Sequence, residues 1–414
     1  MKMKNKILSF LAASVIVAIA SVGIISLRTS QLQAAGNDNR VDVFVSFSRT
    51  PNQADATLIR AFGGRVIYMY RITPAIAANI PEAAINGLLR NPHVTAVELD
   101  SEVYAADAEL DNSWGVQRIG AGTVHDGGNK GLGIKIGIID SGINYNHPDL
   151  NNNFDPLNRG YDFVQKDTDP MDVYGHGTHV AGTACAGDNN FGVVGVAPNC
   201  ALYSLRVLND DGVGSWSAVI AAMDWAVQNG MQVVNLSLGS SRDPGTAVKT
   251  AFDNAEKIGV VIAAAAGNSG NTAGKGNNII YPAKYASVIA VGATDATDTR
   301  ASFSSTGSTL ELVAPGVSVL STWNDSTSPH DPQPICVDSV CYYKYGSGTS
   351  MASPHVAGVA ALVIAKGVAD ANGNGRINDE VRQRMKETAQ DLGKTGWDPQ
   401  YGYGLVNAVA AVTP

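Results

Sequence analysis

Apolar and polar residues follow different patterns in successive parts of the chain, and the first part is almost wholly apolar. Residues 7–27 form this run, and it follows the basic residues Lys2, Lys4 and Lys6. A positive start followed by an apolar run is typical of a secretory signal. We therefore expect a signal peptide over residues 1–35, although the run is also long enough to span a bilayer as an uncleaved anchor.

The pattern of residues 36–106 predicts a small α+β domain. Residues 41–47 alternate between apolar and polar side chains with the period of a strand. Two helical stretches, each opened by a proline, are expected among three further strands. These strands are predicted at 65–70, 75–80 and 94–103. The order β-α-β-β-α-β is that of a ferredoxin-like fold, and we interpret the acidic, Ala-rich residues 105–112 as a linker.

Residues 107–414 alternate between apolar strands and helices. The strands are nearly all apolar, as is typical of parallel strands that are buried on both faces. We expect strands at 134–139, 201–208, 232–238, 259–266 and 288–292, and helices at 176–187, 216–229, 246–257 and 350–366. This alternation predicts an α/β domain with a mainly parallel central sheet. In such sheets, functional side chains gather at the C-terminal ends of the strands.

Three polar residues stand at such element ends. Asp140 ends the first apolar strand, His176 begins a helix, and Ser350 begins another. A serine hydroxyl is a weak nucleophile and needs a base, which an imidazole supplies. A buried carboxylate then fixes the tautomer of the imidazole and stabilises its charged form. The three residues are therefore candidates for a nucleophile, its base and the acid that orients the base.

Each of these residues also has an ordinary structural interpretation. Asp140 and Ser350 could cap a turn or a helix. His176 and His179 have the H-x-x-H spacing of a metal pair, but the Glu and the third ligand of a zinc protease are missing. We expect His179 to pack inside the protein, and we favour the catalytic interpretation of the other three.

The strings around these residues resemble those of the subtilisin-like serine proteases. The order Asp140, His176, Ser350 is the chain order of that family. The similarity runs over residues 114–407, and its most specific string, over 348–358, is GTSMASPHVAG. The resemblance implies a three-layer fold and a serine endopeptidase that acts on proteins and peptides through an acyl-enzyme.

The resemblance also implies that the enzyme is synthesised with a propeptide, and it assigns a role to a further residue of the active site. Residues 36–106 are similar to the family's propeptide, a folding aid and inhibitor, so we expect a secreted, monomeric enzyme synthesised as a zymogen. The peptidase domain would then be 107–414. Asn268 follows the strand expected at 259–266 and corresponds to the amide that stabilises the oxyanion together with the Ser350 N–H. Taken alone, Asn268 could equally be a turn residue.

In this family the substrate lies as an added strand between two backbone segments. The matching positions are Gly212, Gly214, Ser237, Leu238 and Gly239. Main-chain pairing carries no side-chain code, so the specificity is expected to be broad. Ile280 stands where relatives often carry glycine. At the base of the first pocket it would favour small or medium residues; alternatively, its side chain points into the core.

A loop after the His176 helix resembles the family's calcium site, which uses oxygen ligands. The corresponding residues are Asp149, Gly187, Asn189, Phe191 and Val193. A further ligand is expected near residues 110–112, and the alternative is a metal-free Asn/Gly turn. The string that starts at Asp370 resembles an EF-hand loop, but Val381 replaces its final Glu. There we favour a polar turn in which Asn378 caps the next helix.

Composition and cysteine content complete the expectations. With 29 basic and 37 acidic residues the net charge is −8, and 45% of residues are apolar, which excludes a disordered chain and a strongly basic nucleic-acid binder. We expect no nucleic acid and, in the mature form, no membrane as partners. Four cysteines fit an exported protein. We favour the pairs Cys185–Cys200 and Cys336–Cys341 over other pairings or buried free thiols.

Overall fold

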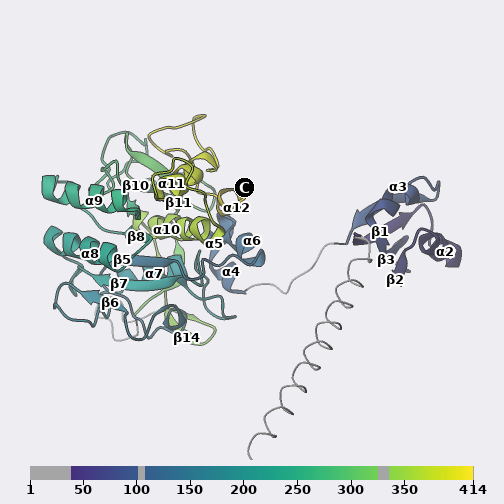
Figure 1. Ribbon diagram of the computed structural model, residues 1–414, viewed down its shortest axis with the longest axis horizontal. Coiled ribbons are helices and arrows are strands. Elements are labelled where there is room, and N and C mark those ends of the chain that lie inside the picture. Colours follow the sequence, from purple (N-terminus) through teal and green to yellow (C-terminus); the bar gives the residue numbers. More distant parts are fainter. Residues whose placement is uncertain (1–38, 101–107, 325–334, 414) are drawn as a thin grey trace, which may run out of the picture. The chain divides into compact units, whose positions relative to one another are not determined.

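The computed structural model describes residues 39–100, 108–324 and 335–413. These residues form two compact units that divide near residue 105, and each is considered by itself (Figure 1). The signal peptide expected over 1–35 and the domain boundary expected at residue 106 lie outside the described ranges. No helix in the described part of the chain is both long and apolar enough to cross a bilayer.

The first unit has the predicted β-α-β-β-α-β order. Its strands are β1 (Arg40–Phe47), β2 (Arg65–Met69), β3 (Ala75–Pro81) and β4 (Val94–Leu99), and its helices are α2 (Gln53–Ala61), η1 (Glu82–Ala84) and α3 (Ile85–Leu88). The strands form one antiparallel sheet in the order β2-β3-β1-β4. Val45, Ile59 and Ile76 are fully buried between this sheet and the helices, because alternate strand residues face the same side.

The second unit is built on a seven-stranded sheet in the order β11-β10-β9-β8-β5-β7-β6. All neighbouring strands in it are parallel. The strands are β5 (Lys135–Asp140), β6 (Gly160–Asp162), β7 (Ala201–Arg206), β8 (Val233–Leu236), β9 (Val261–Ala265), β10 (Ile289–Thr294) and β11 (Leu310–Pro315). The mainly parallel central sheet predicted from the sequence is therefore confirmed.

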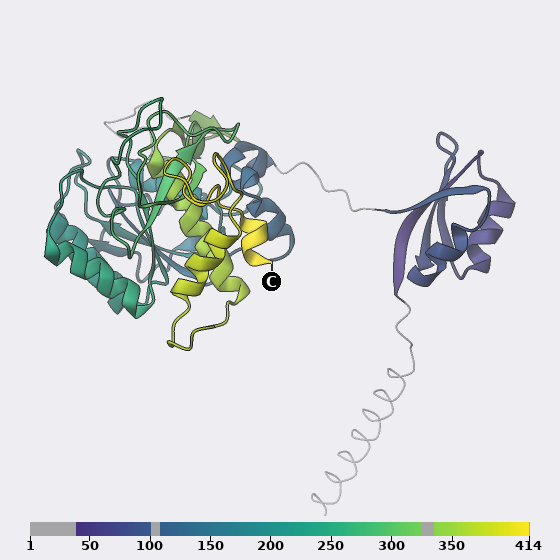
Figure 2. The same ribbon diagram turned by 90° about the horizontal axis from the view of Figure 1, so that it is seen from above.

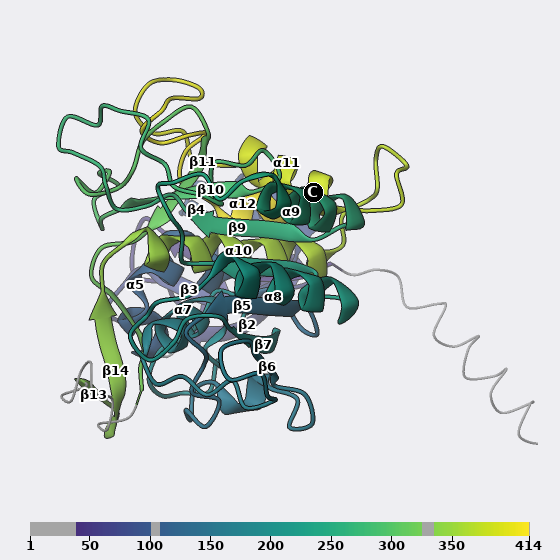
Figure 3. The same cartoon turned by 90° about the vertical axis from the view of Figure 1, so that its left-hand side faces the viewer.

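Helices cover both faces of this sheet and make three layers. The helices α8 (Trp216–Gln228) and α9 (Thr246–Ile258) lie side by side on one face, and α7 (His176–Cys185) and α10 (Thr349–Lys366) lie on the other (Figures 1 and 3). Helix α10 is buried over residues 351–363, because α7, the sheet and the two C-terminal helices surround it. These are α11 (Asn378–Glu387) and α12 (Ala408–Val412), drawn in yellow-green and yellow in Figure 2.

A smaller antiparallel sheet and two disulfides complete the unit. The sheet has the order β12-β14-β13, with β12 at Val319–Thr322, β13 at Ile335–Val337 and β14 at Val340–Gly346. Cys336 and Cys341 are bonded across the β13–β14 hairpin. Cys185 and Cys200 form the second disulfide and join the end of α7 to the start of β7. Both favoured pairings are confirmed.

Two local expectations are wrong. Residues 108–112, expected in a linker, form helix α4 (Ala108–Asn112), the first of three short helices with α5 (Trp114–Arg118) and α6 (Ala121–Asp126). Its Glu109 is only 2% exposed, because the calcium-like loop donates hydrogen bonds to it. Asn378 is the first residue of α11, not its cap, since its amide donates instead to the carbonyl of Glu256.

Candidate active site

The fold brings the predicted catalytic residues to one edge of the sheet. Asp140 is the last residue of β5, and Ser237 and Asn268 follow the C-terminal ends of β8 and β9, its two successive neighbours. Because parallel strands end at the same edge, these residues lie along one line. His176 begins α7 and Ser350 lies in the first turn of α10, which packs across the same strands.

The pair Asp140 and His176 is the most firmly held part of the site. Asp140 Oδ1 accepts hydrogen bonds from His176 Nδ1 at 2.8 Å and from the Ser141 N–H at 2.7 Å. The carboxylate is fully buried, whereas 22% of the His176 side chain is exposed. Burial is the largest single influence and would lower the pKa of His176, but the charge and hydrogen bond of Asp140, together with the charge of Asp172, outweigh it and raise that pKa above its ordinary value. The bond also leaves Nε2 as the ring nitrogen that faces outward.

Asp172, which the sequence analysis missed, fixes the start of the His176 helix. Its carboxylate accepts hydrogen bonds from the N–H groups of Gly175 and Thr178 at 2.8 and 2.9 Å. It also accepts one from the Ser141 hydroxyl at 3.0 Å. These bonds satisfy N–H groups that a helix start leaves unpaired. Burial is the main cause that raises the pKa of Asp172 to about 6. Its position four residues before His176 was the only available signal.

The Ser350 hydroxyl lies at this edge but is turned toward the backbone. It donates to the carbonyl oxygen of Ser237 at 3.2 Å. Among the described residues, no hydrogen bond joins it to the ring of His176. Ser350 is partly exposed, so rotation of its side chain between staggered positions is open to it. In catalytic sites without substrate, hydrogen bonds between the reacting groups are often long or poorly aligned.

The amide of Asn268 is held in one orientation. Its Oδ1 accepts hydrogen bonds from the N–H of Thr349 at 2.9 Å and from the Thr349 hydroxyl at 3.0 Å. The Thr349 hydroxyl accepts in turn from the Gly267 N–H at 3.0 Å. An N–H group can only donate, so the atom that faces Thr349 must be the amide oxygen. The donor group Nδ2 is therefore directed away from Thr349, on an exposed residue beside Ser350.

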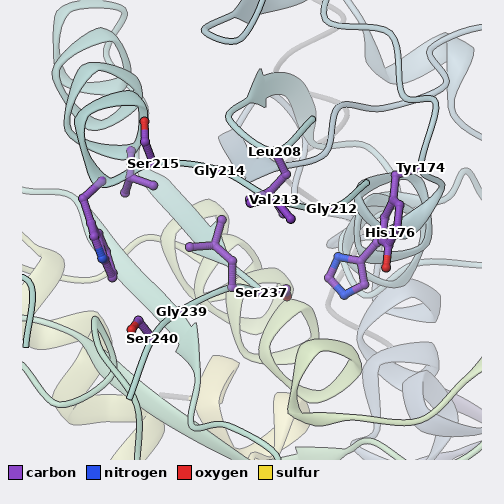
Figure 4. A pocket seen from close by; sticks show the side chains of 13 residues that line it. Tyr174, His176, Leu208, Gly212, Val213, Gly214, Ser215, Ser237, Gly239 and Ser240 are labelled. Carbon is purple, nitrogen blue, oxygen red and sulfur yellow. The ribbon is translucent and has the colours of Figure 1, made fainter. Parts of the chain in front are cut away.

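A recess of about 540 Å³ lies next to His176 and contains the predicted substrate-binding segments. Its lining includes Gly212, Gly214, Ser237, Leu238 and Gly239. Figure 4 shows Tyr174 and His176 at one end of the recess and Ser240 at the other. Gly239 needs its small size, since a Cβ there would lie 2.2 Å from the carbonyl oxygen of Tyr281.

Ile280 lies beside this recess and is partly exposed rather than in the core. A Cβ placed on Gly239 would be 2.8 Å from Ile280 Cδ1, and one on Gly267 would be 2.9 Å from Ile280 Cγ2. The isoleucine thus fills space between these two glycines.

The predicted calcium ligands lie together around one buried carboxylate. They are Gly187, Asn189, Phe191 and Val193 in the loop after α7, with Asp149 beside them. Asp149 accepts hydrogen bonds from the Asn189 amide at 2.9 Å, the Val193 N–H at 3.0 Å and the Tyr343 hydroxyl at 2.9 Å. Asp149 is only 1% exposed, and burial is the main cause that raises its pKa to about 6. No described basic side chain pairs with it.

Two carboxylates that the sequence analysis missed hold the same loop. Glu109 accepts hydrogen bonds from the N–H of Asn189 at 3.0 and 3.2 Å. Asp338, at the tip of the β13–β14 hairpin, accepts one from the N–H of Gly192 at 2.8 Å. Glu109 lies one residue before the region in which a further ligand was expected. The oxygen-rich surroundings suit a hard cation, although the Asn189 amide must turn over to offer its oxygen.

The EF-hand-like string forms a polar turn. Both oxygens of Asp370 accept hydrogen bonds from backbone N–H groups of residues 373–375. Within the described ranges, no three or more His, Cys, Asp or Glu side chains are grouped so that they could hold a metal ion.

His179 is fully buried and contacts the carbonyl oxygens of Val319 and Lys344, and burial lowers its pKa to about 3.

Comparison with known proteins agrees with this arrangement. The sequence profile of the subtilase family of peptidases matches residues 131–404. Subtilisin J of Geobacillus stearothermophilus and subtilisin E of Bacillus subtilis (strain 168) are each 38% identical to this chain over 406 residues, which cover 96% of this chain and 97% of either relative. Subtilisin DY of Bacillus licheniformis is 46% identical over 298 residues, 72% of this chain and 97% of that relative.

Proposed function

Because the chain belongs to the subtilase family and is a serine endopeptidase, we propose that Asp140, His176 and Ser350 cleave its substrates through an acyl-enzyme. The observation that carries the proposal is the 2.8 Å bond between Asp140 and His176 at the sheet edge where Ser350 lies in the first turn of α10. This bond leaves the outward nitrogen of His176 free to act as a base.

The chemistry follows from these positions. When Ser350 leaves the carbonyl of Ser237, its hydroxyl can give its proton to His176 while its oxygen attacks the peptide carbonyl. Asp140 stabilises the resulting imidazolium without taking the proton. His176 then protonates the leaving amine and later activates the water that hydrolyses the acyl-enzyme. Asp140 favours the charged form of His176 in the same way before substrate binds, which is why it contributes to the raised pKa of His176.

The negative charge of the tetrahedral intermediate needs donors that are already in place. Asn268 Nδ2 and the N–H of Ser350 are the proposed donors. The support is the double hydrogen bond that holds the oxygen of Asn268 on Thr349. A fixed donor stabilises the developing charge more than mobile water does, because it needs no reorganisation during the reaction.

The recess beside His176 is the proposed substrate site. A substrate strand would pair with the backbone at residues 212–214 and 237–239, so specificity is broad and sensitive mainly to pocket size. Ile280 fills space between Gly239 and Gly267. The first pocket is therefore shortened, and small or medium side chains are preferred before the cleaved bond.

We further propose that the enzyme is secreted as a zymogen. The signal peptide expected over residues 1–35 would direct export, and residues 36–106 would act as folding aid and inhibitor of the mature monomer. The separate core of the first unit supports such a role, as does the similarity to two subtilisins over 96% of the chain. Two disulfides agree with an oxidising compartment.

Calcium is the proposed structural cofactor. The carbonyl oxygens of Gly187, Phe191 and Val193, the Asn189 amide and the Asp149 carboxylate would hold it, with Glu109 as the additional acidic neighbour. When bound, the ion supplies only charge and cross-linking at this loop. The support is a buried carboxylate without a basic partner among the described residues.

Hydrolysis of casein by the purified protein, with and without a serine-directed phosphonyl fluoride, tests the function. We expect hydrolysis that the reagent abolishes, and a Ser350→Ala variant that folds but does not turn over. Undiminished hydrolysis by Ser350→Ala would contradict the assignment of the nucleophile. Its near-ultraviolet circular dichroism, compared with that of the unmodified protein, provides the control for folding.

A further inference from the structure

Behind the Ser350 turn lies a buried group of polar side chains that the proposed mechanism does not use. It consists of Asn235 in β8, Ser237 after β8 and Ser353 in α10, which we call the Asn235 cluster. Asn235 and Ser353 are fully buried, and Ser237 is 5% exposed. Buried polar groups cost free energy unless they are hydrogen-bonded, so each of these side chains is expected to have a hydrogen-bond partner.

Pro354 creates the need for the first bond. In a regular helix the N–H of residue 354 would donate to the carbonyl of Ser350, four residues earlier. A proline has no N–H, and Pro354 lies inside α10. The carbonyl of Ser350 instead accepts a hydrogen bond from the Ser237 hydroxyl at 2.8 Å. A side chain outside the helix thus holds the backbone of the proposed nucleophile.

The proton order in the Asn235 cluster follows from this bond. A carbonyl can only accept, so the Ser237 hydroxyl must donate to Ser350. Its oxygen then accepts from Asn235, which lies at 3.0 Å and must present its Nδ2. The amide oxygen of Asn235 therefore faces Ser353, whose hydroxyl donates to it at 2.7 Å. Every member has one possible orientation, which makes the group rigid.

We propose that Asn235 is a positioning residue for catalysis: through the hydroxyl of Ser237 it fixes the carbonyl of Ser350, and through Ser353 it fixes the same turn of α10. This inference rests on the proposed function of Ser350. Asn235 itself touches neither substrate nor the reacting atoms.

The place of Asn235 in the sheet argues against a role in packing alone. It is the one polar residue of β8, and its register partners are Ile138 on β5 and Ala263 on β9. An apolar side chain of similar size would suit these neighbours without the cost of burying an amide. The amide is instead paired at both ends with residues that contact the Ser350 turn.

Substitution of Asn235 by a side chain of similar size tests the inference. In Asn235→Leu we expect kcat to fall about fivefold, since the oriented hydrogen bond to Ser237 is worth about 1 kcal/mol and its loss acts through the nucleophile. KM should change by less than about twofold, because Asn235 does not line the recess and the backbone that would pair with substrate is kept. The second-order rate of inactivation by a phosphonyl fluoride, which reads the reactivity of Ser350, should fall with kcat.

The control variant is Asn153→Leu. Asn153 is also buried, and its amide donates to three carbonyls near the Cys185–Cys200 disulfide, away from the Ser350 turn. We expect it to lower the melting temperature while kcat and the inactivation rate stay unchanged. Equal losses of kcat in both variants, or an unchanged kcat in Asn235→Leu, would overturn the inference.

A milder variant covers the case in which Asn235→Leu does not fold. Ser353→Ala removes only the outer bond of the Asn235 cluster, and we expect kcat to fall about threefold with KM unchanged; an unchanged kcat would contradict the inference. The proposed function is tested separately. If the unmodified protein neither hydrolyses casein nor reacts with the phosphonyl fluoride, that function fails, whereas an active protein with insensitive variants refutes only the role of Asn235.

Discussion

Removing the hydroxyl of Thr349 should weaken the proposed oxyanion site without removing any group that contacts the substrate. Thr349 is fully buried, and its hydroxyl makes one of the two hydrogen bonds that hold the oxygen of Asn268. The substitution Thr349→Val keeps the shape of the side chain and leaves the backbone N–H as the only remaining partner. Asn268 is then free to sample orientations in which Nδ2 no longer faces the developing charge.

The size of the effect follows from the bonds that are lost. One hydrogen bond of about 1 kcal/mol corresponds to about a fivefold fall in kcat. The hydroxyl also accepts the N–H of Gly267, and this buried donor would lose its partner. An unsatisfied buried donor costs about 1–3 kcal/mol of folding free energy. We therefore expect a lower melting temperature together with the lower kcat.

Steady-state hydrolysis of a peptide anilide, well below the melting temperature of each variant, measures the catalytic part. Thr349→Ser is the matched control, because it keeps the hydroxyl and loses only a methyl group. KM should be the same in both variants, since Thr349 does not line the recess. If Thr349→Val turns over as fast as Thr349→Ser, the hydroxyl does not orient Asn268 and the reasoning is refuted.

Three further predictions concern pH, specificity and calcium. The rate kcat/KM should fall as pH drops through a pKa above about 6.5, because the raised pKa of His176 means that it loses its basic form earlier. In Asp140→Asn the pKa that governs the residual activity should be lower than in the unmodified protein. An unchanged fall of kcat/KM at acidic pH would contradict the pairing of Asp140 with His176. The variant Ile280→Gly should raise kcat/KM for Phe relative to Ala before the cleaved bond; an unaltered ratio in a peptide series would show that Ile280 does not limit the pocket. A calcium chelator should lower the melting temperature, since a ligand that binds only the folded state stabilises it, whereas Asp149→Ala should make the melting temperature insensitive to calcium; a chelator effect of equal size in both would place the ion elsewhere.

The parts of the fold that could be predicted from sequence are those with strong local signals. The central strands are continuous apolar runs, and Asp140, His176 and Ser350 stand in specific strings at their ends. Helix α4 was missed because its acidic, Ala-rich sequence has no apolar period. The burial of Glu109 depends on a loop 80 residues later in the chain.

Contacts between distant residues explain most of what the sequence did not reveal about the site. The bond between Asp338 and Gly192 joins positions 146 residues apart, and that between Ser237 and Ser350 joins positions 113 apart. No local pattern marks either pair. The orientation of the Ser350 hydroxyl was likewise not predictable, because it depends on which acceptor is nearest after folding.

The disulfide between Cys185 and Cys200 closes a ring around the loop proposed to bind calcium. It ties the end of α7 to the start of β7, so the ends of this ring stay fixed even when its interior rearranges. His176 stands at the opposite end of α7. A disturbance within the ring is therefore confined by this covalent link, so we expect the imidazole of His176 to keep its position whether or not the proposed calcium ion is bound.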